Sequence, residues 1–163
     1  MATVIRNREI VSDPWQRIEA GGGVPEHGDV IVPLAVWQKE RDALLARKGR
    51  IGVLLEPADE PGAIAADLER LALVAVNFPQ FTDGRGYSTA RLLRERYGYK
   101  GELRAVGDVL RDQLFYLARV GFDAFALRAD QDAEAALSAF GDFSEAYQTS
   151  VDRPHPLFRR RAA

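Results

Sequence analysis

Short apolar runs alternate with longer segments of helical periodicity along most of the chain, and this alternation constrains the fold more than any other feature. An apolar run bounded by turn residues is typical of a buried strand, and apolar residues spaced by three and four are typical of one helix face. Strands that alternate with helices indicate βαβ units and a mostly parallel sheet. The predicted strands are Val30–Leu34, Ile51–Leu55, Leu73–Phe78, Glu102–Val106 and Phe122–Arg128. The predicted helices are Ala35–Lys48, Gly62–Ala72, Tyr87–Tyr97, Asp108–Val120 and Asp132–Tyr147.

About five such βα units suit two architectures, a partial (β/α) barrel and an open doubly wound sheet, and their spacing along the chain does not choose between them. Both architectures bind ligands where loops and helix starts meet at the carboxyl ends of the strands. The sequence therefore predicts an α/β fold whose functional residues follow the strands.

The chain is expected to form a single domain. Its 163 residues, 47% of them hydrophobic, are enough to bury a sizeable core. Residues 1–28 are rich in Gly and Pro and predict an N-terminal extension, hairpin-like because short strands at Thr3–Ile5 and Glu9–Val11 flank Asn7. Residues 29–147 hold the βα-repeat core. Residues 148–163 form a C-terminal tail, which carries three consecutive arginines and has too little apolar content to pack as an element.

The composition of the chain disfavours several classes of partner and cofactor. The net charge of -2 provides no basic field for nucleic acid, and no apolar run approaches the roughly 20 residues that span a membrane. The start of the chain lacks the pattern of a secretory signal, so a cytoplasmic location is expected. The absence of cysteine excludes thiolate chemistry and an iron–sulfur cluster held by the chain's own cysteines. Because His27 and His155 have no neighbour at ligand spacing, no metal and no cofactor are expected.

The loop FTDGRGYS after the third strand is the first candidate site. It leads into a helix, and a helix start beside Arg85, Ser88 and Thr89 suits a small oxyanion such as sulfate, sulfite or phosphate. Asp83 is a candidate catalytic carboxylate in the same loop. The alternative is structural, because Asp83 with Gly84 also makes a turn and Ser88 also suits a helix cap.

The fourth strand exit, which begins at Gly107, supplies the second candidate site. Asp108 suits the N-cap or the first turn of the predicted helix, and it is also a candidate acid or base, with Arg104 or Arg111 holding an anionic substrate. A salt-bridged surface explains the same residues without any chemistry. Phe115 and Tyr116 lie on the flank of this helix, where aromatic residues either pack under a neighbouring helix or form a homodimer interface.

The segment NFPQFTDGRGYSTARLLRERYGYKGELRAVGDVLRDQLFYLARVGFDAFALR, residues 77–128, resembles an uncharacterised bacterial domain-of-unknown-function family. Members are commonly labelled probable oxidoreductases involved in sulfite reduction, since their genes lie beside those of assimilatory sulfite and adenylyl-sulfate reductases. The segments IRNREIVSDPWQRI and FSEAYQTSVDRPHPLFRRR extend the resemblance to nearly the whole chain. The resemblance implies a role in sulfate assimilation and cysteine biosynthesis.

Sulfite reduction normally uses siroheme and an iron–sulfur cluster, and this chain has neither cysteines nor a recognisable flavin or nicotinamide fingerprint. We therefore expect an accessory or adaptor protein that binds sulfite reductase or a sulfonucleotide reductase, with a small oxyanion at the FTDGRGYS turn. Two alternatives stay open. One is an enzyme of barrel-like ancestry that acts on a small anionic sulfur or phosphate metabolite through Asp83, Arg85, Arg104 and Asp108. The other is a dimer-forming scaffold.

Overall fold

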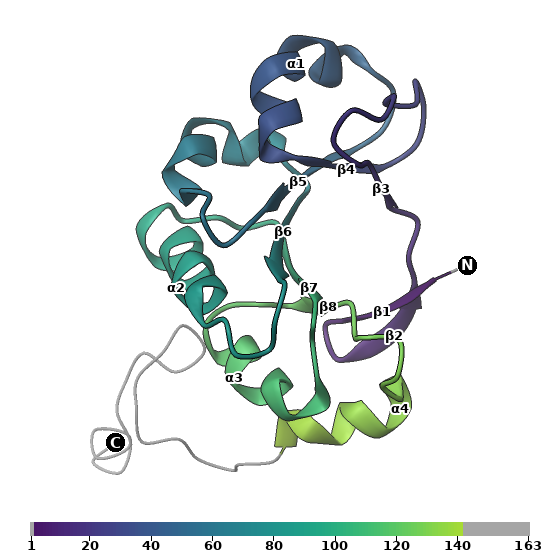
Figure 1. Cartoon of the computed structure of the whole chain (residues 1–163), viewed down its shortest axis with the longest axis vertical. Helices are drawn as coiled ribbons and strands as arrows, with labels where there is room; N and C mark the ends of the chain where they lie inside the picture. Colours follow the sequence, from purple (N-terminus) through teal and green to yellow (C-terminus); the bar gives the residue numbers. More distant parts are fainter. Residues whose placement is uncertain (1, 142–163) are drawn as a thin grey trace.

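The computed structural model describes residues 2–141, and within this range the chain forms a mixed α/β fold on one eight-stranded sheet. The strand order is β2-β1-β8-β7-β6-β5-β4-β3. The sheet curls into a half barrel, and the helices lie on its outer side (Figure 1). The predicted α/β class is confirmed.

The parallel part of the sheet follows the order of the chain. Each strand from β3 to β8 lies beside the next one in sequence, as in a barrel. A doubly wound sheet instead reverses its strand order at a switch point. The half barrel is therefore the first of the two predicted architectures. The parallel strands are β3 (Gln16–Arg17), β4 (Val30–Pro33), β5 (Ile51–Leu55), β6 (Leu73–Phe78), β7 (Glu102–Gly107) and β8 (Ala124–Phe125).

A helical segment follows each strand from β4 onward, but the repeat is not a clean set of five βα units. β8 contains two residues, η1 is a 3₁₀ helix, and α2 continues as the π-helix η2. The last predicted helix extends past residue 141, and residues 142–147 lie outside the described range. The helical segments are α1 (Leu34–Ala46), η1 (Pro61–Arg70), α2 (Arg85–Arg91), η2 (Leu92–Arg96), η3 (Arg111–Gln113), α3 (Leu114–Arg119), α4 (Ala133–Ala136) and η4 (Leu137–Gly141).

The first residues form the predicted hairpin. β1 (Thr3–Arg6) and β2 (Glu9–Ser12) are antiparallel, and Asn7 and Arg8 both have positive φ, at 51° and 66°, as a tight two-residue hairpin turn requires. β1 also pairs antiparallel with β8, while β3 pairs with β4 at the other end of the sheet. The segment between β2 and β3 therefore runs across the open side of the half barrel (Figure 1). The predicted extension thus contributes three strands, of which β3 was not predicted.

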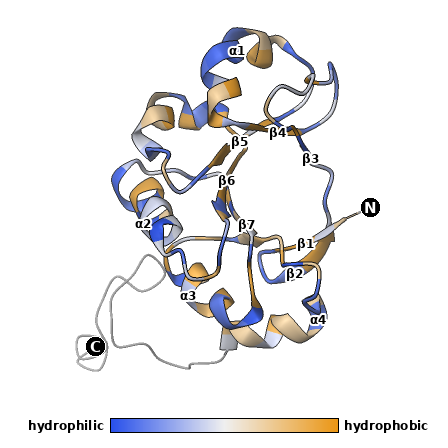
Figure 2. Ribbon diagram, in the orientation of Figure 1, coloured by the Kyte–Doolittle hydropathy of each residue, from blue (hydrophilic) through white to orange (hydrophobic). Residues whose placement is uncertain are grey.

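Two apolar layers lie on opposite faces of the sheet, because successive strand residues point to opposite sides. On the convex face, strand residues such as Val74 and Val76 pack with helix residues such as Leu93 and Leu114. The apolar layer on the concave face contains fewer buried residues than the layer on the convex face. The hydropathy colouring shows apolar residues along the strands and polar residues on the outer helix surfaces (Figure 2). Fully or nearly buried side chains of the concave layer are Trp15, Ile31, Leu54, Leu73, Ala75 and Val106.

None of the helices within residues 2–141 has the length and apolar character needed to cross a bilayer. The predicted tail, residues 148–163, lies outside the described range, so its expected role stays a prediction.

Candidate functional site

The carboxyl ends of β6, β7 and β8 meet in one polar cluster. Asp108, just after β7, accepts a hydrogen bond from the Phe81 backbone N–H at 2.9 Å, which draws the loop after β6 onto it. Its other carboxylate oxygen accepts from Arg128 at 2.8 Å, and Arg128 also donates twice to Asp130, at 2.6 and 2.7 Å. We name this the carboxyl-edge cluster, and its members are Phe81, Asp108, Gln113, Arg128 and Asp130.

Gly107 lets β7 end where Asp108 can reach this cluster. Its φ is +93°, which side chains rarely adopt, and a Cβ there would lie 2.4 Å from both the Asn77 side-chain oxygen and the Phe78 carbonyl. The Asp108 N–H then donates to the Phe78 carbonyl at 2.7 Å. The backbone of β7 therefore closes directly onto β6 before the chain turns away.

The predicted capping role of Asp108 is wrong. The helical segment starts at Arg111, with Leu110 as its N-cap, and Gln113 accepts from the Leu110 N–H at 3.0 Å. The Asp108 side chain instead crosses to the neighbouring loop. The sequence placed Asp108 at a strand exit but did not indicate which loop its carboxylate contacts.

The loop after β6 is held from both sides. While Asp108 accepts from the Phe81 N–H, the Gln113 amide donates to the Phe81 carbonyl at 3.0 Å. The Phe81 side chain nevertheless remains 55% exposed. A large aromatic side chain thus projects from a backbone that is fixed at both its donor and its acceptor.

Two of the predicted oxyanion residues of this loop, Arg85 and Thr89, use their polar side-chain groups within the loop and helix. Arg85 donates to both carboxylate oxygens of Asp83, at 3.0 and 2.7 Å, and the Thr89 hydroxyl donates weakly to the Arg85 carbonyl at 3.4 Å. Helix α2 begins at Arg85 rather than at Tyr87 as predicted, so Ser88 is its fourth residue. Oxyanion binding stays a prediction, and an anion here would compete with Asp83 for Arg85.

The contact with Arg85 also affects the chemistry of Asp83. Hydrogen bonds from the Arg85 side chain and backbone lower the pKa of the Asp83 carboxyl below its usual range. A general acid or base works best with a pKa near the operating pH. Asp83 is therefore held as a carboxylate that serves the turn.

Two further residues reach this edge of the sheet. The Asn77 amide donates to Glu56 at 2.8 Å, which links the end of β6 to the residue after β5. The Glu56 N–H in turn donates to Asp59 at 2.8 Å. The sequence gave no signal for Asn77, because its position in an apolar run is typical of an ordinary strand.

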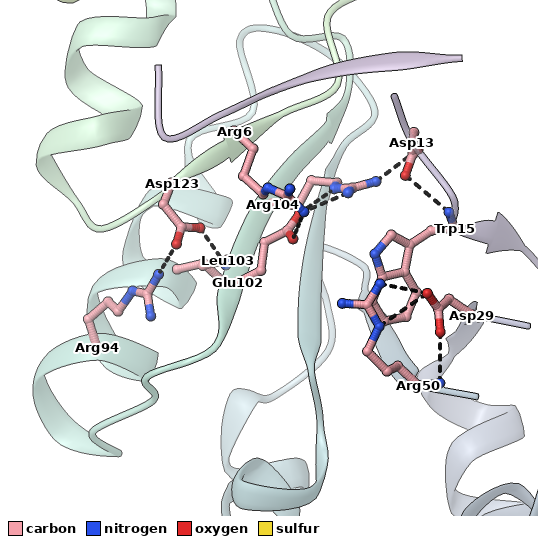
Figure 3. Close-up of polar contacts among 10 residues, drawn as sticks. All are labelled: Arg6, Asp13, Trp15, Asp29, Arg50, Arg94, Glu102, Leu103, Arg104 and Asp123. Carbon is pink, nitrogen blue, oxygen red and sulfur yellow. Dashed lines mark hydrogen bonds and ion pairs between the residues drawn. The ribbon is translucent and has the colours of Figure 1, made fainter. Parts of the chain in front are cut away.

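Arg104 does not join the edge cluster. Its side chain is 2% exposed on the concave face, where it pairs with Asp13 at 3.0 Å and Glu102 at 2.8 Å, and Arg6 approaches Glu102 at 3.9 Å (Figure 3). We name Arg6, Asp13, Glu102 and Arg104 the concave-face network. The network ties β7 to β1 and to the segment that crosses the open side. Arg104 already has two carboxylate partners, so the predicted role in holding a substrate anion has no support in its contacts.

Trp15 lies beside this network on the crossing segment. The Arg50 guanidinium stacks over the indole at 5.0 Å and also donates to Asp29 at 2.6 Å (Figure 3). Because Trp15, Asp29 and Arg50 immediately precede β3, β4 and β5, these contacts link the starts of the three strands. Hydrogen bonds from Arg50 lower the pKa of Asp29. The buried indole Nε1 has no hydrogen-bond partner among the described residues.

A separate arginine, Arg94, organises the opposite, amino-terminal end of the strands. It donates to the carbonyls of Tyr99, Gly101 and Gly121 and pairs with Asp123 at 3.5 Å (Figure 3). Arg94 therefore belongs to the framework rather than to a free basic face of α2 and η2.

Arg111, the last predicted anion ligand, lies at the start of η3. Its backbone N–H donates to the Gln131 side chain at 3.1 Å, and its guanidinium contacts Ser138 at 3.1 Å and Asp112 at 3.4 Å. These contacts join η3 to the segment around α4. Within residues 2–141, no group of three His, Asp or Glu side chains is arranged to hold a metal ion.

The fold and the edge cluster define an α/β half-barrel protein in which the strand exits carry ion pairs and an exposed aromatic side chain. The chain belongs to the family described as "Bacterial protein of unknown function (DUF934)", whose model matches residues 52–158. No curated protein matches the chain. The matched segment begins in β5, so the strands β1 to β4 and helix α1 precede it.

Proposed function

We propose that this chain is an accessory or adaptor protein of assimilatory sulfate and sulfite reduction, which docks on sulfite reductase or a sulfonucleotide reductase through the carboxyl edge of the half barrel. The pathway and the partner come from the sequence resemblance. The docking surface comes from the contacts at the edge cluster.

Phe81 is the observation that supports docking. An exposed aromatic ring on a mobile loop loses conformational freedom when it binds, whereas the Phe81 backbone is already fixed by Asp108 and Gln113. Rigid aromatic anchors often contribute most of the binding energy at protein interfaces. Phe81 is therefore suited to enter a pocket on a partner, and the surrounding ion pairs are suited to the polar rim of the contact.

The alternative is an enzyme that acts on a small anionic sulfur or phosphate metabolite. The contact between Phe81 and Asp108 supports it in one respect, since it brings the third and fourth strand exits together. Arg104, however, has its partners on the concave face, and Asp83 is committed to Arg85. The adaptor role needs no rearrangement of these pairs, and we therefore prefer it.

The docking proposal is tested by capture of purified sulfite reductase, and separately of a sulfonucleotide reductase, on the immobilised full chain. We expect Phe81→Ala to lower the captured amount at least about tenfold, as loss of an aromatic anchor does. Leu92→Ala is the matched control, because it removes another exposed apolar side chain, on η2, beyond the far end of α2. Equal capture by wild type and Phe81→Ala would reject the anchor, and no capture of either reductase by wild type would reject the adaptor role.

A further inference from the structure

A cleft of about 230 Å³ opens at the same edge of the sheet, between β1 and the chain that follows β8. The two strands pair through Ile5 with Phe125 and Arg6 with Ala124. Beyond Phe125 the chain stays with β7, because the Ala126 N–H donates to Ala105 and the Arg128 N–H donates to Val109. The start of β1 is thereby left apart from its neighbour.

Thr3 faces this gap with its backbone. Backbone N–H groups alternate sides along a strand, and the Asn7 N–H donates to Asp123 on the β8 side, so the N–H and carbonyl of Ile5 and Thr3 point the same way. Ile5 meets Phe125, but no hydrogen bond joins Thr3 to Leu127 in the part of the chain that the structure describes. One donor and one acceptor of a strand edge are therefore presented at the mouth of the cleft.

The lining of the cleft suits an apolar side chain. Its lining includes Ile5, Phe125 and Leu127, which belong to one apolar layer, and their neighbour Val4. The volume is below the roughly 300–1,000 Å³ of typical sites for drug-sized ligands. The cleft therefore has room for one side chain and its adjoining backbone rather than for a large cofactor.

The rim of the cleft selects against an anion. Arg128 lies on the rim, but Asp108 and Asp130 both pair with it, so the three charges sum to a negative value. Gln131 also lines the cleft, but its side-chain oxygen accepts from the Arg111 N–H and its side chain also bonds Asp130, so the donor presented to the cleft is the Thr3 backbone N–H. Hydrogen-bond donors without net positive charge suit a neutral carbonyl, as in a peptide group.

We propose that this cleft binds an extended segment of the protein partner, with an apolar side chain of leucine size against Phe125 and its peptide group against Thr3. Addition of a segment to a strand edge is a recurrent mode of peptide recognition, in which the main chain gives affinity and a pocket gives specificity. The inference rests on the proposed adaptor role. The cleft is continuous with the Phe81 loop, because Asp108 bonds both Phe81 and Arg128 and Arg128 lines the cleft.

The first test is a titration of the full chain with N-acetyl-leucine N-methylamide, followed by backbone amide chemical shifts. We expect saturable shifts confined to residues 3–5 and 127–131. The alanine analogue is expected to bind more weakly because it fills less of the cleft, and N-acetyl-leucinate is expected to bind more weakly because of Asp108 and Asp130. Shifts that are absent, non-saturable or spread over the whole chain would overturn the inference.

Ala133→Phe fills the cleft from α4, and Ala135→Phe is its matched control, since Ala135 is exposed on the same helix and does not line the cleft. Ala133→Phe should weaken the leucine probe at least about tenfold, whereas Ala135→Phe should leave its affinity within about twofold. If Ala133→Phe does not fold, the difference in affinity between the leucine and alanine probes for the wild-type chain still tests whether the cleft binds an apolar side chain. In the reductase capture, loss with Phe81→Ala but not with Ala133→Phe would refute the cleft and leave the adaptor role standing.

Discussion

Replacement of Arg104 by methionine tests whether the concave-face network holds the half barrel together. Arg104 is 2% exposed, and the Asp13 and Glu102 side chains are 14% and 12% exposed. Removal of one partner from a buried ion pair costs about 3–5 kcal/mol, because the remaining charge is left without compensation. Glu102 keeps a distant contact with Arg6, and Asp13 keeps the Trp15 N–H at 3.2 Å, but neither replaces the guanidinium. We therefore expect Arg104→Met to lower the free energy of unfolding by about 3–5 kcal/mol.

Urea unfolding followed by tryptophan fluorescence and circular dichroism measures this loss. With an m-value of about 2 kcal/mol/M, the midpoint should fall by about 1.5–2.5 M. The triple variant Asp13→Asn, Glu102→Gln, Arg104→Met removes all the charges that form the two short pairs, so it should recover to within about 1 kcal/mol of wild type. Arg85→Met breaks an exposed pair of similar length and should leave the midpoint unchanged.

The reasoning would be refuted if Arg104→Met unfolded within about 1 kcal/mol of wild type, or if the triple variant were as unstable as the single one. The first result would mean that the network carries no net cost when broken. The second would mean that the methionine fails by its shape rather than by the charges it leaves behind.

Two further predictions concern the edge of the sheet and acid stability. Gly107→Ala should destabilise the protein by at least about 1–3 kcal/mol, because its φ of +93° disfavours a side chain and the Cβ would meet Phe78 and Asn77 at 2.4 Å. The control in thermal unfolding is Gly84→Ala, where an added Cβ meets nothing within 4 Å. Equal melting temperatures for the two variants would contradict the close approach at Gly107. The pKa of Asp29 is lowered in the folded state by Arg50, so the stabilisation from this pair is complete above the unfolded value of about 3.9 and is lost as the pH falls through the folded value. Urea unfolding between about pH 7 and about pH 3 should therefore show a shallower acid loss in Asp29→Asn than in wild type, and identical slopes would argue against this role of Arg50.

The strands could be predicted closely because their signal is local. β5 and β6 have the predicted bounds, and β4 and β7 differ by one residue at one end. β4, β5 and β6 are mostly apolar runs buried on both faces, which is a local signal. β8 is shorter than predicted, because the chain leaves β1 after Phe125 and follows β7. The sequence could not indicate β3 (Gln16–Arg17), because two exposed polar residues pair with β4 only through tertiary context.

The candidate site was predicted in location but not in its contacts. The sequence placed Asp83, Arg85 and Asp108 at strand exits, and the structure brings the two exits together through Phe81. The sequence could not show that Arg104 lies apart from these strand-exit residues. The alternation of strand residues assigns Arg104 to one face of the sheet, but it does not identify Asp13 and Glu102 as its partners there. These are long-range pairs, and Arg128 is likewise known as a partner of Asp108 only once β7 and β8 are paired.

Under the proposed adaptor role, residues that precede the matched segment contribute to the surface that the partner contacts. β1 forms one wall of the cleft, and Asp13 pairs with Arg104 at the centre of the concave face, yet both lie before residue 52. Phe81, Asp108 and Arg128 lie within the matched segment. The proposed anchor Phe81 therefore lies within the matched segment, whereas the proposed binding cleft lies between that segment and β1. Changes at Thr3 or Val4 should then alter which side chain the cleft accepts without disturbing the Phe81 loop, because neither residue contacts that loop and the connection between the two features runs from Arg128 through Asp108 to Phe81.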